Sequence, residues 1–322
     1  MSISIKSNSD GISGAIQVNG IDSIPFNASG LVNPSANRNR MINGNMSIDQ
    51  RNSGAAQTIT AASTLAYTVD RWYAYCTGTN VTGQQVATGT NDSKYKYQFT
   101  GAASVTGIGF AQRIEAANTY PLAGQTVTLS AEMSNSLLTS VTWAAYYATT
   151  TDTFGTLASP TKTLISTGTF TVSSTDTKYS TQIAIPSGAT TGIEIVFSVG
   201  AQTSGTWSIE NVQLELGSIA TPIENRLYGA ELALCQRYTR ILDGLLISHV
   251  MSSSNLYNPT VTFATMRVPP TFSNASYVAG SGSAGTVNLY YTTPTSMSFN
   301  NSANNWTINA YVLLTATLSA EL

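Results

Sequence analysis

The chain has very few charged residues. Lys, Arg, Asp and Glu make up 9% of its 322 residues, against about a quarter in an ordinary soluble protein. The 14 Lys and Arg residues are scattered singly, and the formal net charge is −2. A protein that grips nucleic acid or an anionic membrane needs a basic stripe or patch. The composition therefore argues against binding to nucleic acid or to an anionic membrane surface.

Histidine and cysteine are also scarce. His249 is the single histidine, and its position in an alternating segment favours a structural role over a catalytic one. Cys76 and Cys235 are too few and too far apart to form a disulfide framework. We expect both to be reduced, buried, small side chains, with a disulfide between them as the alternative.

Long apolar runs are missing. The first residues, MSISIKSNSD, lack the apolar core of a secretory signal, and no run of about 18 apolar residues could span a bilayer. We therefore expect a soluble protein that is made in a cytoplasm.

Apolar and polar residues alternate along most of the chain, which is the period of a strand with one buried face. Short alternating segments separated by Gly, Asn, Asp and Pro predict about nine or ten strands in two packed sheets of jelly-roll type. The expected strands are an opening one near 42–48 and others at 95–99, 107–114, 126–133, 140–148, 168–172, 179–185, 193–199 and 206–216.

The closing strand changes phase. Trp207 and Ile209 share one parity, whereas Val212, Leu214 and Leu216 share the other. One extra residue near Glu210-Asn211 would bring both halves to the same face. The sequence therefore predicts a β-bulge there.

A helix-forming run, GAELALCQRY, follows this strand, and then alternation returns. The last segment of the chain has the longest alternation. It needs a surface to cover its apolar side, and other copies of the chain are a candidate for that surface. Its apolar parity consists of Trp306, Ile308, Ala310, Val312, Leu314, Ala316 and Leu318. The predicted divisions are an extended β segment (1–40), a sandwich (41–217), a helical connector (218–240) and a β-rich tip domain (241–322).

Catalytic motifs are absent from the sequence. It contains no G-x-S-x-G elbow, no P-loop and no cysteine cluster. Hydrolysis of a glycan would need two carboxyl groups close together, and the candidates for such a pair are Asp70, Glu115, Glu132 and Glu194. Glu132 and Glu194 lie on the polar parity of their strands, so we expect no enzymatic activity, no catalytic residue and no cofactor.

Aromatic residues on strands are the best candidates for a binding site. In DRWYAYC, the small Ala74 and Cys76 share the parity of a tryptophan, which turns Tyr73 and Tyr75 outward. In VTWAAYYA, the same argument turns Tyr146 outward. Such rings can stack on the apolar face of a sugar. The alternative is that they merely cover a sheet face or a subunit contact.

Three stretches carry a resemblance to a known family. They are NRMINGNMSIDQRNSG (39–54), YTVDRWYAY (67–75), and VQLELGSIATPIENR with the following YGAELALCQRYTR (212–240). In this order they resemble the tail-fibre and related virion fibre proteins of tailed bacteriophages, whose middle domain is a carbohydrate-binding-module-like jelly roll. The segment FATMRVPPTFS resembles, over a shorter stretch, the C-terminal tip of such fibres.

The resemblance implies a structural virion protein that works as a homotrimer and adheres to a host-surface glycan. Residues 1–40 would then join other virion proteins of the tail, baseplate or capsid, with a flexible tail as the alternative. Modules of this type can also hold a structural Ca²⁺, here near Asn43, Asn45 and Glu210, although one acid and two amides form a weak ligand set, and no metal site is predicted. A head decoration protein or tail adaptor that binds no sugar is the alternative function.

Overall fold

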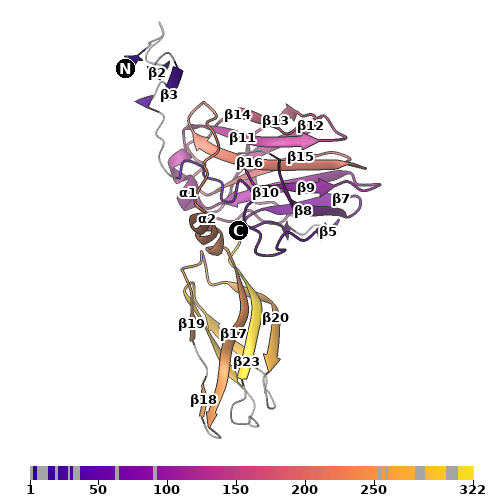
Figure 1. Cartoon of the computed structure of the whole chain (residues 1–322), viewed down its shortest axis with the longest axis vertical. Helices are drawn as coiled ribbons and strands as arrows, with labels where there is room; N and C mark the ends of the chain where they lie inside the picture. Colours follow the sequence, from indigo (N-terminus) through magenta and orange to yellow (C-terminus); the bar gives the residue numbers. More distant parts are fainter. Residues whose placement is uncertain are drawn as a thin grey trace.

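Strands account for nearly all regular structure in the computed structural model of the chain. The structure describes residues 3–5, 14–18, 21–27, 30–31, 37–61, 65–89, 93–252, 255–257, 260–279, 287–301 and 311–322. Figure 1 shows a small N-terminal sheet, a β-sandwich and a tip domain one after another along the long axis. Among the described residues, no helix is long and apolar enough to cross a membrane. The predicted all-β jelly-roll class is confirmed.

The sandwich consists of two six-stranded antiparallel sheets. The first sheet has the order β13-β12-β15-β10-β7-β6, and the second has the order β14-β11-β16-β9-β8-β5. The first contains β6 (Ala66–Tyr67), β7 (Tyr73–Thr77), β10 (Gly107–Ile114), β12 (Ser140–Ala148), β13 (Lys162–Thr171) and β15 (Ile193–Val199). The second contains β5 (Gln57–Ile59), β8 (Val81–Ala87), β9 (Tyr95–Thr100), β11 (Thr126–Asn135), β14 (Thr177–Ala184) and β16 (Thr206–Leu216).

Aromatic side chains connect the two sheets through the core. Trp207 of β16 stacks on Phe99 of β9 with 5.1 Å between ring centroids, and Phe99 meets Phe110 of β10 edge to face at 5.5 Å. Phe110 in turn stacks on Trp72 at 4.7 Å. Stacked and edge-to-face pairs add to the stabilisation from burial, so this chain of rings fixes one sheet against the other.

The predicted bulge is present in β16. Ser130 pairs with Gln213 and Glu132 pairs with Glu210, so Ala131 alone faces two residues of β16. Asn211 has φ 51°, the left-handed conformation that a bulge uses. The four core residues of β16 are fully buried on one face: Trp207, Ile209, Val212 and Leu214. Leu216, which the alternation predicted on that face, is 54% exposed because the strand ends there.

The opening strand predicted near 42–48 is wrong. These residues form turns, and Asn43 and Met46 have φ values of 57° and 55°. Single backbone bonds from Arg40 to Leu214 (2.8 Å) and from Val212 to Gly44 (2.9 Å) replace a continuous ladder with β16. Left-handed residues break the extended backbone that a ladder requires.

The connector contains α2 (Tyr228–Gln236), which confirms the predicted helix. The other helical elements, α1 (Ala116–Thr119) and the 3₁₀ turn η1 (Tyr120–Leu122), lie between β10 and β11. Cys235 of α2 and Cys76 of β7 are both buried and unpaired, as predicted.

The strands of the tip domain form two sheets with the orders β18-β17-β23-β20 and β19-β22-β21. They are β17 (Thr239–Ser252), β18 (Asn255–Tyr257), β19 (Thr260–Thr262), β20 (Thr271–Ala279), β21 (Val287–Thr292), β22 (Ser296–Asn301) and β23 (Tyr311–Ser319). Leu314, Ala316 and Leu318 of β23 are buried in one cluster with Met297 and Phe299 of β22.

The chain therefore covers Leu314, Ala316 and Leu318 of the last apolar ribbon by itself, and other copies of the chain, the candidate cover, are not required at these residues. The N-terminal part of the predicted ribbon, Trp306, Ile308 and Ala310, lies outside the described residues.

The N-terminal segment forms a four-stranded sheet in the order β1-β2-β3-β4. Its strands are β1 (Ile3–Ile5), β2 (Gly14–Val18), β3 (Ile21–Asn27) and β4 (Gly30–Leu31). The expectation of extended β structure in this segment is met, and its attachment to other virion proteins stays a prediction.

We expect deletion of Asn211 to abolish the cooperative thermal unfolding transition measured by circular dichroism. Without the extra residue, either Trp207 and Ile209 or Val212 and Leu214 would turn toward the outer face. Asn211→Gly keeps the residue count and suits a positive φ, so this control should retain a cooperative transition. A deletion variant that melts like the parent protein would contradict the role of the bulge.

Candidate functional site

The two faces of the first sheet differ in their surroundings. Trp72, Ala74 and Cys76 belong to the central core, whereas Tyr73 and Tyr75 belong to a separate cluster on the outer face. This arrangement follows from the alternation of side chains along β7. The expectation that Ala74 and Cys76 mark the packed face is confirmed.

Tyr146 of β12 lies on the same outer face. Its neighbours Trp143 and Tyr147 contact the central core, while Tyr146 packs against the outer-face cluster to which Tyr73 and Tyr75 also belong. Two strands, β15 and β10, separate β12 from β7. The structure thus places all three predicted site tyrosines on one face of the sheet.

A glycine sets the position of the Tyr75 ring. Gly109 of β10 pairs directly with Tyr75 across the ladder. A Cβ atom at position 109 would lie 2.1 Å from Cζ of Tyr75 and 2.3 Å from its Cε1. Only a residue without a side chain therefore lets the ring lie across the backbone of β10. The ring is half-buried, and its remaining surface lines a pocket.

Tyr73 has a different environment from the other two tyrosines. It is 1% exposed, and its hydroxyl donates a hydrogen bond of 2.6 Å to Oε1 of Glu194. Burial, and then the Glu194 carboxylate, raise the pKa of Tyr73 well above its ordinary value. Tyr73 therefore lies beneath the surface and positions Glu194, while the half-buried rings of Tyr75 and Tyr146 remain partly accessible.

Glu194 of β15 is the charged centre of this face. It is fully buried, and its carboxylate accepts hydrogen bonds from Tyr73, from Nε of Arg113 (2.7 Å) and from Nζ of Lys162. A buried carboxylate without such partners would carry a large desolvation cost. Because both cations are drawn to the same carboxylate, each has a fixed place beside the tyrosines.

The cations and rings form one surface. Nζ of Lys162 lies 4.2 Å from the centroid of the Tyr146 ring, a cation–π geometry. Burial raises the pKa of Tyr75 to about 12, with smaller contributions from Glu194 and Tyr146. Both partly accessible tyrosines keep their protons at neutral pH, since burial and the Glu194 charge also raise the pKa of Tyr146. Their hydroxyls can therefore donate hydrogen bonds to a ligand.

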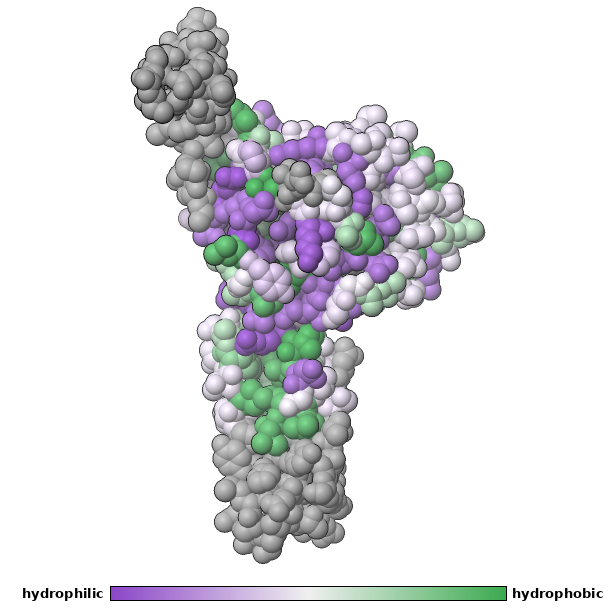
Figure 2. Space-filling view, viewed as in Figure 1, coloured by the Kyte–Doolittle hydropathy of each residue, from purple (hydrophilic) through white to green (hydrophobic). Residues whose placement is uncertain are grey.

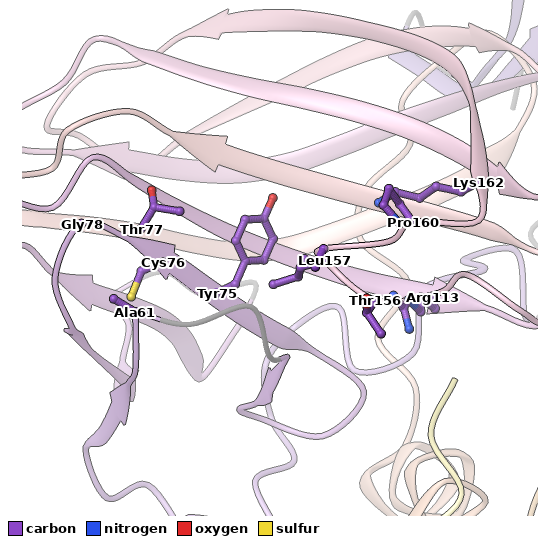
Figure 3. A pocket seen from close by; sticks show the side chains of 11 residues that line it. Ala61, Tyr75, Cys76, Thr77, Gly78, Arg113, Thr156, Leu157, Pro160 and Lys162 are labelled. Carbon is purple, nitrogen blue, oxygen red and sulfur yellow. The ribbon is translucent and has the colours of Figure 1, made fainter.

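A pocket of about 550 Å³ lies at the edge of this face. One wall is the end of β7 with Tyr75 and Thr77, and the other is the loop before β13, which contributes Thr156, Leu157 and Pro160. Figure 3 shows these side chains together with those of Arg113 and Lys162. The lining combines an aromatic ring, apolar groups, two threonine hydroxyls and two cations.

The sequence did not point to Gly109, Arg113, Lys162 or the loop that supplies Leu157. Each lies on a different element from the tyrosines. The pairing of β10 with β7 and of β13 with β12, together with the loop before β13, brings them together. A glycine inside an alternating strand was one usable signal, because it marks a close approach of another group.

The carboxyl groups weighed as a catalytic pair lie in separate surroundings. Glu194 is bound by two cations, Asp70 pairs with Arg51 at 3.4 Å, and Glu115 pairs with Arg237 at 2.9 Å. Glu132 lies on β11 of the second sheet. The backbone of His249 lies in β17 of the tip domain, and its side chain is outside the described structure.

The residues considered for a structural Ca²⁺ have separate partners. The Asn43 amide bonds the backbone of Ile48 and Asp70, at 2.8–3.0 Å. Asn45 accepts from the backbone of Ser47 at 3.3 Å, and Glu210 accepts from Thr88 Oγ1 at 3.0 Å. In the part of the chain that the structure describes, no group of three His, Cys, Asp or Glu side chains could hold a metal ion.

Solved structures with similar folds were found for about half of the chain. The enzymatically active domain of tailspike protein 4 from bacteriophage CBA120 is 16% identical, with a TM-score of 0.34; the match covers 56% of this chain and 22% of that one. The xylan-binding module CBM22-2 of Paenibacillus barcinonensis Xyn10C is 14% identical, with a TM-score of 0.32, and covers 46% of this chain and 92% of its own.

A third structure, a family 61 carbohydrate-binding module in complex with β-1,4-galactotriose, is 12% identical with a TM-score of 0.35. That match covers 56% of this chain and 99% of the module. No family model matches the sequence, and no curated protein matches it. The jelly-roll class of this chain therefore rests on its own strand order.

The buried Glu210 gives a prediction for the pH dependence of stability. Burial raises the pKa of Glu210 from 4.5 to about 7, with additions from Asp176 and Glu132. The folded state thus holds this proton more tightly than the unfolded state does. The contribution of protonated Glu210 to the free energy of unfolding is fully present below about pH 4.5 and is lost as the pH rises through about 7.

Glu210→Gln should therefore melt at a higher temperature than the parent protein at pH 8 and at a similar temperature at pH 4. Asp243→Asn, at an exposed carboxyl group of the tip domain, is the control and should follow the parent protein. Equal melting temperatures of the parent and Glu210→Gln at both pH values would show that this carboxyl group titrates normally.

Proposed function

We propose that the outer face of the first sheet binds a saccharide and that the chain is an adhesive fibre protein of a tailed-bacteriophage virion. The observation that carries the saccharide site is the Tyr75 ring, which lies across Gly109 and opens onto the pocket. A ring in this position can stack on the C–H groups of a pyranose.

The polar groups around the ring suit the same ligand. Arg113, Lys162 and Thr156 line the pocket and can donate hydrogen bonds to sugar hydroxyls. The cations are already held by Glu194, so little side-chain freedom is lost when a ligand binds. A small set of fixed polar groups beside an apolar surface is the usual composition of a ligand pocket.

The fibre role is supported by the resemblance over residues 39–240 and by the order of the parts along the chain. The N-terminal sheet and the tip domain lie at opposite ends of the long axis, with the sandwich between them (Figure 1). The N-terminal sheet would attach to the particle, and the sandwich would face the host glycan. Weak binding at each site would be multiplied by several chains per fibre and several fibres per particle.

A saccharide-binding experiment tests this proposal. The purified chain is applied to an array of bacterial surface polysaccharides and β-1,4-linked plant oligosaccharides, and hits are measured by titration calorimetry. Tyr75→Ala should weaken binding on the order of tenfold, because it removes a stacking ring. Gly109→Ala should have a similar effect, because its methyl group displaces the same ring.

Tyr120→Ala is the matched control, since Tyr120 is 67% exposed and does not line the pocket. Its affinity should equal that of the parent protein. Binding that survives both Tyr75→Ala and Gly109→Ala would place the saccharide elsewhere, and an array without hits would refute saccharide binding.

A homotrimer is part of the same proposal. Within the described tip domain, Leu246, Tyr290 and Tyr291 are 46–70% exposed, and Figure 2 shows an apolar patch on that domain next to the sandwich. Sedimentation equilibrium at micromolar concentration should give three times the mass of one chain. The mass of a single chain under these conditions would rule out the trimer.

A further inference from the structure

The guanidinium group of Arg113 contacts three separate parts of the molecule. Its Nε bonds Glu194 at 2.7 Å, its Nη2 donates to the carbonyl of Gly155 at 3.2 Å, and its Nη1 donates to the carbonyl of Leu322 at 2.7 Å. The first partner lies on the proposed saccharide face and the second in the loop that forms the pocket wall. The third belongs to the segment that follows β23.

This segment, Ala320 to Leu322, is held tightly against the sandwich, and we call it the clasp. The Glu321 carboxylate pairs with Arg51 at 3.0 Å and with Arg71, and it accepts a bond of 2.9 Å from Thr239. Figure 1 marks the end of the chain at the joint between the sandwich and the tip domain.

The backbone of the clasp is also satisfied. The amide of Ala320 donates to Tyr238 at 2.7 Å, and Arg267 donates to the carbonyls of Ala320 and Glu321 at 2.8 Å. The Tyr67 hydroxyl donates to the carbonyl of Leu322 at 3.0 Å. The clasp thus joins the tip domain, the connector and the first sheet.

A second connection runs parallel to the first. Arg71 is buried, and its guanidinium lies 3.4 Å from the centroid of the Tyr238 ring. It pairs with Glu321 and also donates a hydrogen bond of 2.5 Å to the carbonyl of Arg113. Displacement of the clasp would therefore disturb both the side chain and the backbone of Arg113.

We propose that the docked clasp holds Arg113 in position and thereby fixes the pocket loop, residues 153–161, so that the pocket and the tip domain are energetically coupled. The consequence for ligand binding rests on the proposed saccharide function. A saccharide that orders the loop would strengthen the docking of the clasp. Release of the clasp would lower the affinity for the saccharide by the same factor, because coupling between two sites is reciprocal. In a fibre, attachment at the pocket would thus alter how firmly the tip domain is held.

The geometry of the pocket loop makes it sensitive to Arg113. Within the loop, the amide of Thr156 donates to Ser159 at 3.1 Å, that of Thr161 donates to Phe154 at 3.0 Å, and Gly155 pairs with Pro160 in an isolated bridge. At its ends, Thr153 donates to Thr150 and Thr161 accepts from Thr149, both at 2.9 Å. Besides its bond to Gly155, the Arg113 guanidinium contacts the loop at Phe154, where it lies 5.2 Å from the ring centroid. The backbone bonds join the loop to itself and to its neighbours in the chain, whereas the contacts of Arg113 join it to β10, so loss of Arg113 would lower the free-energy cost of local opening.

Hydrogen exchange of the full chain without any saccharide tests the coupling from both ends. Glu321→Gln removes the charge that pairs with Arg51 and Arg71 and keeps the side-chain length. We expect it to speed exchange of the Thr156 and Thr161 amides by about fivefold or more, the lower end of typical coupling. Glu224→Gln is the control, because Glu224 pairs with Arg226 and the amide of Asn39 at the same joint and does not contact Arg113.

The reverse direction uses Gly155→Ala. Gly155 has φ 71°, and an added Cβ would lie 2.3 Å from the carbonyl oxygen of Ser159, so the loop must shift and withdraw the acceptor of Arg113. Exchange of the Ala320 amide should then rise by about fivefold or more. Gly188→Ala is the matched control, since an added Cβ there meets nothing within 4 Å.

Two results would overturn the proposal. One is a Glu321→Gln protein whose Ala320 amide exchanges faster while the loop amides are unchanged. The other is a Gly155→Ala protein with an unchanged Ala320 amide, and this arm decides the question even if Glu321→Gln fails to fold. Neither measurement involves a sugar, so a failure of saccharide binding on the array remains distinguishable from a failure of the coupling.

Discussion

The ion pairs of Arg71 and Arg51 with the Glu321 carboxylate are the interaction on which the arrangement of this molecule depends. Arg71 is 2% exposed, and burial lowers its pKa and that of Arg51. A buried charge is tolerated only where partners replace water around it. Since Glu321 follows β23 and Arg71 precedes β7, the pairs with Glu321 form only when the tip domain is docked on the sandwich, whereas within the sandwich Arg51 also pairs with Asp70 and Arg71 bonds the carbonyl of Arg113.

The same requirement organises the outer face of the first sheet. Glu194 is buried among aromatic rings, so Tyr73, Arg113 and Lys162 must converge on it. Each of these partners is thereby fixed beside Tyr75 or Tyr146. The groups that satisfy one buried carboxylate thus also form the proposed saccharide surface. Arg113 connects this surface to the clasp through its bond to Leu322. A chain with so few charges uses several of them in these two buried clusters.

The fold could be predicted from the sequence where one periodicity decided the outcome. Alternation placed Ile193–Val199 and Gly107–Ile114 in strands, and the change of parity after Ile209 located the bulge. The prediction failed at 42–48, because the left-handed backbone of Asn43 depends on hydrogen bonds to Ile48 and Asp70. It also failed for the last ribbon, where the alternation of Leu314 and Leu318 indicated a buried face and not what would cover it.

The sequence by itself determined which side of a strand each residue occupies, because side-chain direction follows from local backbone geometry. It therefore placed Tyr73, Tyr75 and Tyr146 on the outer face and Trp207 in the core, but the expectation that Tyr73 is an accessible ring is wrong, because neighbouring side chains bury it on that face. Only the tertiary structure decided that Gly109 lies under Tyr75, that Lys162 reaches Tyr146 and Glu194, and that Glu321 meets Arg71. These contacts join residues far apart in the chain, and their energies depend on the order of strands in the sheets and on burial, which no local pattern encodes.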